Sequence, residues 1–155
     1  MSNELIETFQ KTLEIVVDEA RVSLINRDGI QNAFFVSEDG KKYEVLKVTL
    51  KPELKPEESM QMKLVCRDPS VAIAALIMDA YTRFIPTENF EEVSKPLKDY
   101  PDHMEALLLY IYTRDQSFVR VMPYWKNGPR DYGFADQGWS EATNSEGLFE
   151  NVFKE

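Results

Sequence analysis

The chain has 155 residues, of which 43% are hydrophobic, and this is enough for one hydrophobic core but not for two. The 27 acidic and 18 basic side chains give a formal net charge of −9, which disfavours nucleic-acid binding because phosphates are negative and no run of lysine and arginine forms a basic patch. No stretch resembles a signal peptide or reaches the roughly 18 apolar residues of a membrane span, so we expect one cytoplasmic domain over residues 1–155 that binds neither nucleic acid nor membrane.

An amphipathic helix is predicted at the N-terminus. Apolar residues recur there at helical spacing, while acids and Lys11 lie on the opposite side. Ser2 or Asn3 can cap the start of this helix, and residues 26–29 can end it. The apolar stripe consists of Leu5, Ile6, Phe9, Leu13, Val16, Val17, Ala20 and Leu24.

A β-hairpin and a second, shorter helix are predicted next. Residues 30–37 and 42–50 have strand character, and residues 38–41 between them contain the Asp-Gly pair that is typical of a hairpin turn. Pro56 suits the first turn of the following helix, because its fixed φ is helical and the acids after it match the helix dipole. Residues 67–70 are expected to end this helix.

Residues 71–85 are predicted to form a central strand. Their alanine, leucine and methionine content favours a helix, but the bounding prolines and the apolar character on both faces are typical of a strand in the middle of a sheet. Residues 86–101 contain three prolines and many charges, so a surface excursion is expected there, with one helical turn at 88–93. Residues 104–115 and 117–126 then predict a second hairpin.

The final segment, residues 127–155, is predicted to be irregular. It contains four of the six glycines, and a short amphipathic helix is expected only at 146–153. Helices and strands are thus segregated along the chain, which is typical of the α+β class. We predict a two-layer sandwich, in which a mostly antiparallel sheet of about five strands has both helices packed on one face.

The first candidate site contains the only histidine, with three carboxylates around it. A histidine among carboxylates can bind a divalent metal ion or transfer protons near neutral pH. The alternative is a charged loop before a buried strand, which we prefer because all four groups lie within seven residues and no second histidine completes a ligand set. The four residues are Asp99, Asp102, His103 and Glu105.

Cys66 is the only cysteine, so the chain has no intrachain disulfide. A nucleophilic thiol would need His103 as its base, whereas a free cysteine in an apolar helix is more typical of a core residue. The sequence contains neither the G-x-S-x-G motif of serine hydrolases nor a phosphate-binding glycine loop. We therefore expect no cofactor, and we favour a non-catalytic function.

The second candidate site is a group of large aromatic residues near the C-terminus. Tryptophan and tyrosine supply contact area in recognition surfaces, and nearby glycines allow a partner to approach closely. The same rings would serve equally to seal an open end of the sheet. These residues are Tyr124, Trp125, Tyr132, Phe134 and Trp139.

From charge and the lack of catalytic motifs we predict a small acidic binding or accessory protein, similar in action to an inhibitor or immunity protein. Its partner would be a protein, and the charge favours a basic one because opposite fields accelerate association. Homodimerisation through an exposed sheet edge is a related arrangement. The alternative function is a metal-binding protein or hydrolase that uses the residues around His103.

Overall fold

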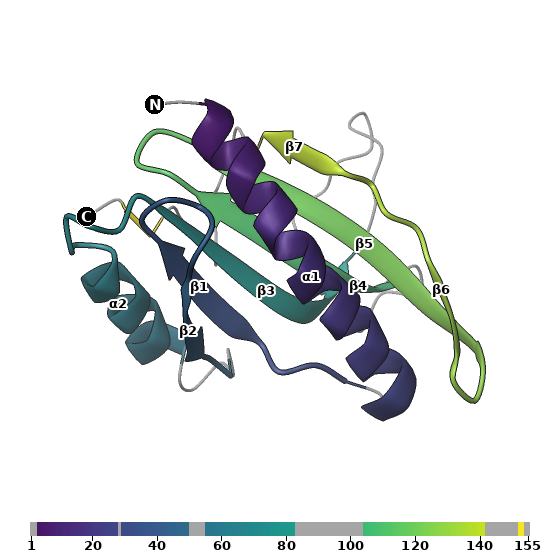
Figure 1. Ribbon diagram of the computed structural model, residues 1–155. Coiled ribbons are helices and arrows are strands. Elements are labelled where there is room, and N and C mark those ends of the chain that lie inside the picture. The colour runs from purple at the N-terminus through teal and green to yellow at the C-terminus, as the bar shows by residue number, and fades with distance from the viewer. Residues whose placement is uncertain (1–2, 28, 50–54, 83–103, 142–151, 154–155) are drawn as a thin grey trace, which may run out of the picture.

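The computed structural model describes residues 3–27, 29–49, 55–82, 104–141 and 152–153. Two helices and seven strands occur within these ranges (Figure 1). None of the described helices is long and apolar enough to span a membrane. In chain order the elements are α1 (Asn3–Arg27), β1 (Ala33–Ser37), β2 (Glu44–Lys47), α2 (Lys55–Val65), β3 (Ile73–Thr82), β4 (Met104–Tyr112), β5 (Ser117–Gly128), β6 (Asp131–Phe134) and β7 (Trp139–Glu141).

All seven strands belong to one sheet, in the order β2-β1-β3-β4-β5-β6, and β7 also pairs with β5. Every pair of neighbouring strands is antiparallel. The α+β class with a mostly antiparallel sheet and an N-terminal helix is therefore confirmed. The sheet has more strands than the five predicted, because β6 and β7 form within residues 127–155, which were predicted to be irregular.

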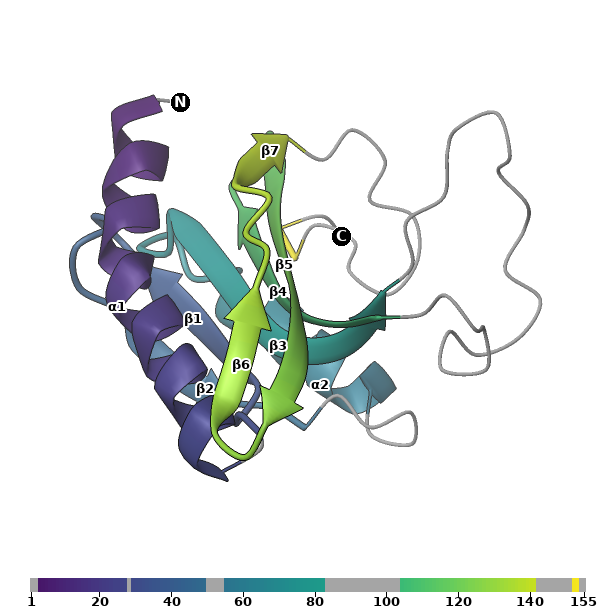
Figure 2. The same cartoon turned by 90° about the vertical axis from the view of Figure 1, so that its right-hand side faces the viewer.

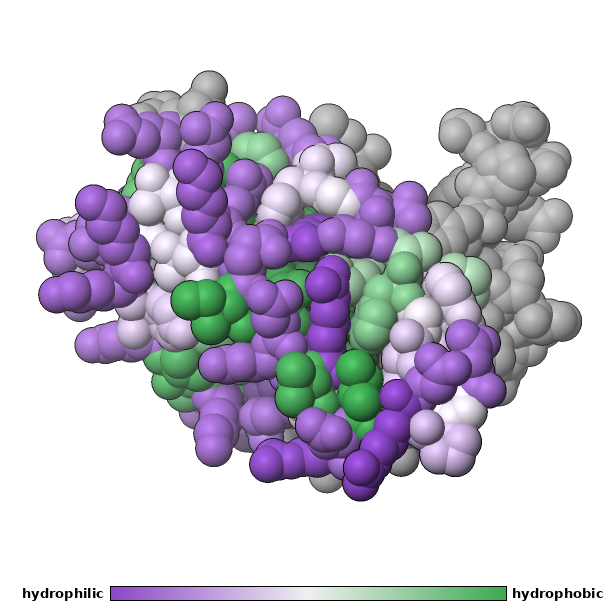
Figure 3. Space-filling model, turned by 45° about the vertical axis from the view of Figure 1, so that its right-hand side comes forward, coloured by the Kyte–Doolittle hydropathy of each residue, from purple (hydrophilic) through white to green (hydrophobic). Residues whose placement is uncertain are grey.

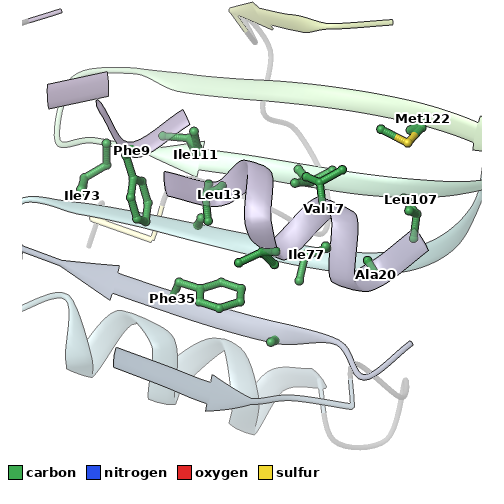
Figure 4. Packing of buried hydrophobic residues seen from close by; sticks show 14 of the residues in the cluster. Phe9, Leu13, Val17, Ala20, Phe35, Ile73, Ile77, Leu107, Ile111 and Met122 are labelled. Atoms are coloured by element: carbon green, nitrogen blue, oxygen red, sulfur yellow. The ribbon is translucent and has the colours of Figure 1, made fainter. Parts of the chain in front are cut away.

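Helix α1 lies across one face of the sheet (Figure 2). Its apolar stripe inserts between side chains that point to the same face from β1, β3, β4 and β5, and together they form the α1-facing cluster. Phe9 and Val17 are completely buried in this cluster, and Leu13 is nearly so (Figure 4). The stripe read from helical spacing is thus the side of α1 that faces the core.

Helix α2 packs against the opposite face, which corrects the prediction that both helices share one face. Met62 of α2 and Cys66 just after it belong to one cluster with Phe34 and Leu76, whose neighbours along β1 and β3 point towards α1. Because successive side chains of a strand alternate between faces, these residues form a separate α2-facing cluster. Val152 near the C-terminus is buried in this cluster as well.

Strand β3 confirms the strand predicted within residues 71–85. Ile73 and Ile77 point into the α1-facing cluster, whereas Leu76 and Met78 point into the α2-facing cluster. The strand has buried neighbours on both faces and paired strands on both sides, which explains why its sequence is apolar without alternation. Burial on both faces outweighs the helix propensity of its alanines.

The predicted hairpin is confirmed, but residues 38–43 join β1 and β2 as a wider loop than a two-residue Asp-Gly turn, and this loop contacts α1. Gly40 has a φ of 79°, a conformation that suits glycine, and an added Cβ would lie 3.2 Å from the carbonyl oxygen of Leu5. The Thr12 hydroxyl donates a hydrogen bond to the Gly40 carbonyl oxygen at 2.5 Å. The excursion predicted at 86–101 lies outside the described residues, as does the helix predicted at 146–153 apart from its last two positions.

Candidate functional site

Most of the cluster around His103 lies outside the described residues. This applies to Asp99, Asp102 and His103, whereas Glu105 is described as an exposed residue at the start of β4. In the strand register Glu105 stands opposite Tyr124 of β5. Among the described ranges of the chain, no group of three or more His, Cys, Asp or Glu side chains is arranged to hold a metal ion.

Tyr124 connects the region of Glu105 to a second carboxylate, that of Asp79 on β3. The Tyr124 hydroxyl donates a hydrogen bond to Asp79 Oδ1 at 2.7 Å. Burial raises the pKa of Asp79, the hydrogen bond from Tyr124 opposes that rise, and the negative charge of Glu105 adds to it. Burial and the Asp79 carboxylate also raise the pKa of Tyr124, so its phenol remains a neutral donor. The hydrogen bond therefore compensates for the partial burial of the Asp79 carboxylate, and it does not activate the Tyr124 proton for transfer.

Three of the five predicted binding aromatics pack together on the α1 side of the sheet. The ring centroid of Tyr124 lies 6.0 Å from that of Tyr132 and 6.2 Å from that of Phe134. Tyr124 is only 7% exposed, and the other two rings are half-buried against the α1-facing cluster. The guanidinium of Arg21 on α1 lies 5.5 Å from the Phe134 ring centroid. Most of this aromatic surface is therefore used inside the molecule.

The two tryptophans lie apart from those three rings. Trp125 points to the other face of β5, is 49% exposed and covers Gly133, where an added Cβ would lie 2.4 Å from the indole. Trp139 of β7 is half-buried, and its ring centroid lies 6.0 Å from the guanidinium carbon of Arg120. The five residues therefore do not form one continuous surface, and a binding role for them stays a prediction.

Arg120 is the centre of a polar cluster that the sequence analysis did not single out. Its side chain is 7% exposed, and its Nε and terminal nitrogen donate to both carboxylate oxygens of Asp136, at 3.0 and 2.5 Å. The other terminal nitrogen donates to Glu14 on α1 at 2.5 Å. Hydrogen bonding to Arg120 lowers the pKa of Asp136, and the same contact raises the pKa of Arg120. This cluster fastens α1 to β5 and to the segment between β6 and β7.

The only sequence signal for this cluster is an arginine within the apolar strand at 117–126. A charge at a core-facing position requires a buried partner. The sequence does not identify that partner, because Glu14 lies 106 residues away from Arg120.

Cys66 follows the last residue of α2 and is 4% exposed. Burial raises the pKa of its thiol to about 12, although the positive charge of Arg114 opposes the rise. The thiolate is the form that attacks substrates and binds metals, so the thiol of Cys66 is poorly suited to either role. Its position in the α2-facing cluster agrees with the interpretation as a core residue.

The outer side of α1 combines acids with two exposed apolar side chains. Ile15 and Val22 are 65% and 54% exposed and lie seven residues apart, on the same side of the helix. Asp18 and Glu19 lie between them, and all four residues border one shallow depression, which Arg27 lines at its end. Figure 3 shows hydrophobic residues among hydrophilic ones on the side of the molecule that carries α1. The exposed acids of α1 are Glu4, Glu7, Glu14, Asp18 and Glu19.

Comparisons of the chain with protein-family models, with curated proteins and with solved structures give no match. Function is therefore inferred from the residues and their arrangement.

Proposed function

We propose that this chain is a small acidic binding protein that acts by associating with a basic protein partner. The observation that carries this proposal is the outer side of α1, where Ile15 and Val22 are exposed among acids. We call this surface, formed by Ile15, Asp18, Glu19 and Val22, the α1 outer face. It belongs to a long helix whose opposite side is buried in the core, so it is held rigidly before any partner arrives.

The charge of the α1 outer face supports a basic partner. Asp18 has a neighbour in Arg21 at 3.7 Å, whereas Glu19 takes part in no ion pair among the described residues. The net charge of −9 adds a long-range field of the same sign. A basic partner is thus attracted from a distance, and its association slows as salt screens the field.

The two apolar side chains define the centre of the contact. Burying an exposed isoleucine or valine side chain fully contributes about 1.5–3 kcal/mol, so these two residues can supply much of the energy of a modest complex. Aspartate and glutamate between them would pair with lysine or arginine beside the partner's own apolar residues. The proposed partner surface is therefore amphipathic and basic, as on a helix that has leucine on one side and lysine on the other.

The test uses a synthetic amphipathic helix with leucine on one side and lysine on the other, and a second peptide in which every lysine is glutamate. Fluorescence anisotropy should show that the lysine peptide binds at least about tenfold more tightly than the glutamate peptide, and that its affinity falls with salt. Equal binding of both peptides would contradict the proposal.

A pair of matched variants locates the surface. Ile15→Ala with Val22→Ala should weaken binding of the lysine peptide about tenfold, because two exposed apolar contacts are lost while helix propensity is kept. Met60→Ala with Leu64→Ala is the control, since these α2 residues are exposed to a similar extent, at 54% and 51%. If both double variants bind the lysine peptide equally, the α1 outer face is not the binding surface.

A further inference from the structure

Strand β2 forms one edge of the sheet. Among the strands that the structure describes, it pairs only with β1. The backbone N–H of Val48 donates to Asn32 just before β1 at 3.1 Å, so the main-chain groups of Val48, and of Leu46 two residues earlier, face β1. The N–H and C=O groups of Val45 and Lys47 therefore face away from β1. An extended chain could pair with this edge.

Apolar side chains gather beside this edge. Of the nine large hydrophobic residues that are exposed in the described part of the chain, five lie on or next to β2 or on α2. Helix α2 lies at the same end of the molecule as β1 and β2 (Figure 1). Tyr43 and Val45 lie two residues apart and point to the α1 side of β2, and exposed apolar neighbours of this kind are typical of a contact surface. The five residues are Tyr43, Val45, Met60, Leu64 and Val65.

The charge around β2 selects the kind of partner. Residues 38–47 contain three acids and three bases, and residues 55–68 also contain three of each. The whole excess of −9 therefore lies elsewhere in the chain. The local charge of this surface therefore adds no repulsion between two copies and no attraction for a basic partner, although the net charge of −9 on each copy still repels the other at long range and salt should favour the dimer. We call this surface, formed by β2 and the exposed side of α2, the β2 edge.

We infer that two copies of the chain form a symmetric dimer by pairing their β2 strands antiparallel. Residues directly opposite in such a pair point to the same face, so the symmetric register places Val45 opposite Val45 of the second copy. Both residues direct their N–H and C=O groups outward, as this register requires. Two β-branched side chains that are each 52% exposed then cover one another.

The same register makes a second contact on each side of the two-fold symmetry axis, which passes between the two Val45 residues. Tyr43 stands opposite Lys47 of the second copy, which brings an ammonium group towards an aromatic ring. The Tyr43 ring is already held edge-on against Phe35, with centroids 5.2 Å apart. The β2 edge is therefore complementary to itself in its outward N–H and C=O groups and in the pairing of Tyr43 with Lys47.

The symmetry axis of this dimer is perpendicular to the sheet, so both copies keep their α1 helices on the same side. The inference does not rest on the proposed function, because the two surfaces share no residue. Where both hold, a partner with two basic segments would meet two α1 outer faces side by side, and the affinity gain of bivalent binding would follow.

Sedimentation equilibrium over a dilution series, combined with hydrogen exchange, tests the dimer. We expect a monomer–dimer equilibrium, with exchange at the Val45 and Lys47 amides at least about tenfold slower in the dimer. The Leu46 and Val48 amides face β1 in both states and should exchange at the same rate at every concentration. A chain that stays monomeric at all concentrations would overturn the inference.

Two substitutions of Val45 test whether the dimer interface lies at β2. Val45→Lys puts two like charges opposite one another, and Val45→Pro removes an N–H that faces away from β1, so each should weaken dimerisation at least about tenfold. Val22→Lys is the matched control, because Val22 is 54% exposed and lies on α1, and it should leave the dimer unchanged. A dimer that survives both Val45 substitutions would also overturn the inference, whatever the result with the basic peptide.

Discussion

The two edges of the sheet are built in different ways. One edge is β2, a single short strand with exposed apolar side chains and balanced charges. The other side of β5 is shared by two strands, β6 near its end and β7 near its start, and the register shifts between Lys126 and Gly128. The segment between β6 and β7 also donates backbone hydrogen bonds to β5, from Ala135 to Pro123 and from Gln137 to Val121, and an edge with such a register shift is a poor template for another strand.

The β6–β7 edge is also linked to α1 through ion pairs, whereas the end of the β2 edge is linked to α2 through the Glu58 carboxylate, which accepts hydrogen bonds from the N–H and the hydroxyl of Thr49. Arg120 reaches Glu14 of α1 with one nitrogen and holds Asp136, between β6 and β7, with two. Arg21 of α1 covers the ring of Phe134 from the same side. One edge of this sheet is thus closed by the ion pairs of the buried Arg120 and by aromatic rings, whereas at β2 the main-chain groups of Val45 and Lys47 face away from the sheet.

The largest effect is expected from Arg120→Met. This change removes the cation that holds α1, β5 and the β6–β7 segment together, and it leaves Asp136 only the Gly138 N–H and the more distant guanidinium of Arg21, at 4.0 Å. Breaking a buried ion pair costs about 3–5 kcal/mol. Because Asp136 and Glu14 are partly exposed, we expect the unfolding free energy to fall by about 3 kcal/mol, the lower limit of that range. Urea denaturation measures it. A loss below about 1 kcal/mol would show that the cluster does not hold this edge.

A smaller effect is expected from Gly133→Ala on β6. The added methyl would lie 2.4–2.6 Å from atoms of the Trp125 indole, so the ring must move. Overpacking of this kind costs about 1–3 kcal/mol, and the exposure of Trp125 places the loss near the lower limit. Denaturation followed by tryptophan fluorescence in a Trp139→Phe background reports both stability and the movement of Trp125.

Gly29→Ala is the control for that prediction, because no atom lies within 4 Å of a Cβ at Gly29. This variant should be neutral, or slightly more stable through the reduced freedom of the unfolded chain. Equal destabilisation by the two alanines would mean that the contact between Gly133 and Trp125 is not the cause.

Asp136→Asn should weaken the same edge in a pH-dependent way. The pKa of Asp136 is lowered in the folded state, chiefly by hydrogen bonding to Arg120, so its stabilising effect is present above the unfolded pKa of about 3.9. That effect is lost as pH falls through the lowered folded pKa. At neutral pH we expect the variant to lose about 1 kcal/mol of unfolding free energy.

The unfolding free energies of the wild type and of Asp136→Asn, measured by denaturation from about pH 2 to about pH 7, check this prediction. The difference between wild type and Asp136→Asn should shrink below about pH 4, because protonation removes the same charge from the wild type. A difference that stays constant down to the lowest pH would contradict an ionic role for Asp136.

The smallest effect is expected at the β2 edge. Val45→Lys should change the unfolding free energy of the monomer by no more than about 0.5 kcal/mol, because Val45 is half exposed and its N–H does not pair with β1. Denaturation at protein concentrations below dimerisation measures the monomer alone. A large loss there would show that β2 is part of the stable core, and the contrast between the two edges would disappear.

The candidate site could be predicted from the sequence only in part. Glu105 and Tyr124 were both singled out, and the structure places them opposite one another across β4 and β5. The partner of Tyr124, Asp79, was not identified, because the contact joins residues 45 positions apart. Ile15 and Val22 fall outside the apolar stripe of α1, and that irregularity was the available signal for the α1 outer face.

The sequence by itself determined the features that depend on neighbouring residues. Helical spacing identified the buried side of α1, the Asp-Gly pair identified the β1–β2 hairpin although not the length of its loop, and apolar character on both sides identified β3 as a central strand. These signals are local because side-chain periodicity and turn conformation involve residues only a few positions apart.

The tertiary structure decided the features that depend on distant residues. It placed α2 on the face opposite α1, although α2 itself was predicted, because a short amphipathic helix can cover either face of a sheet. It also formed β6 and β7 from a glycine-rich segment, since β5 supplies their hydrogen bonds, and it brought Glu14 to Arg120. Each of these outcomes depends on the energy of contacts between segments far apart in the chain, which no local pattern of residues encodes.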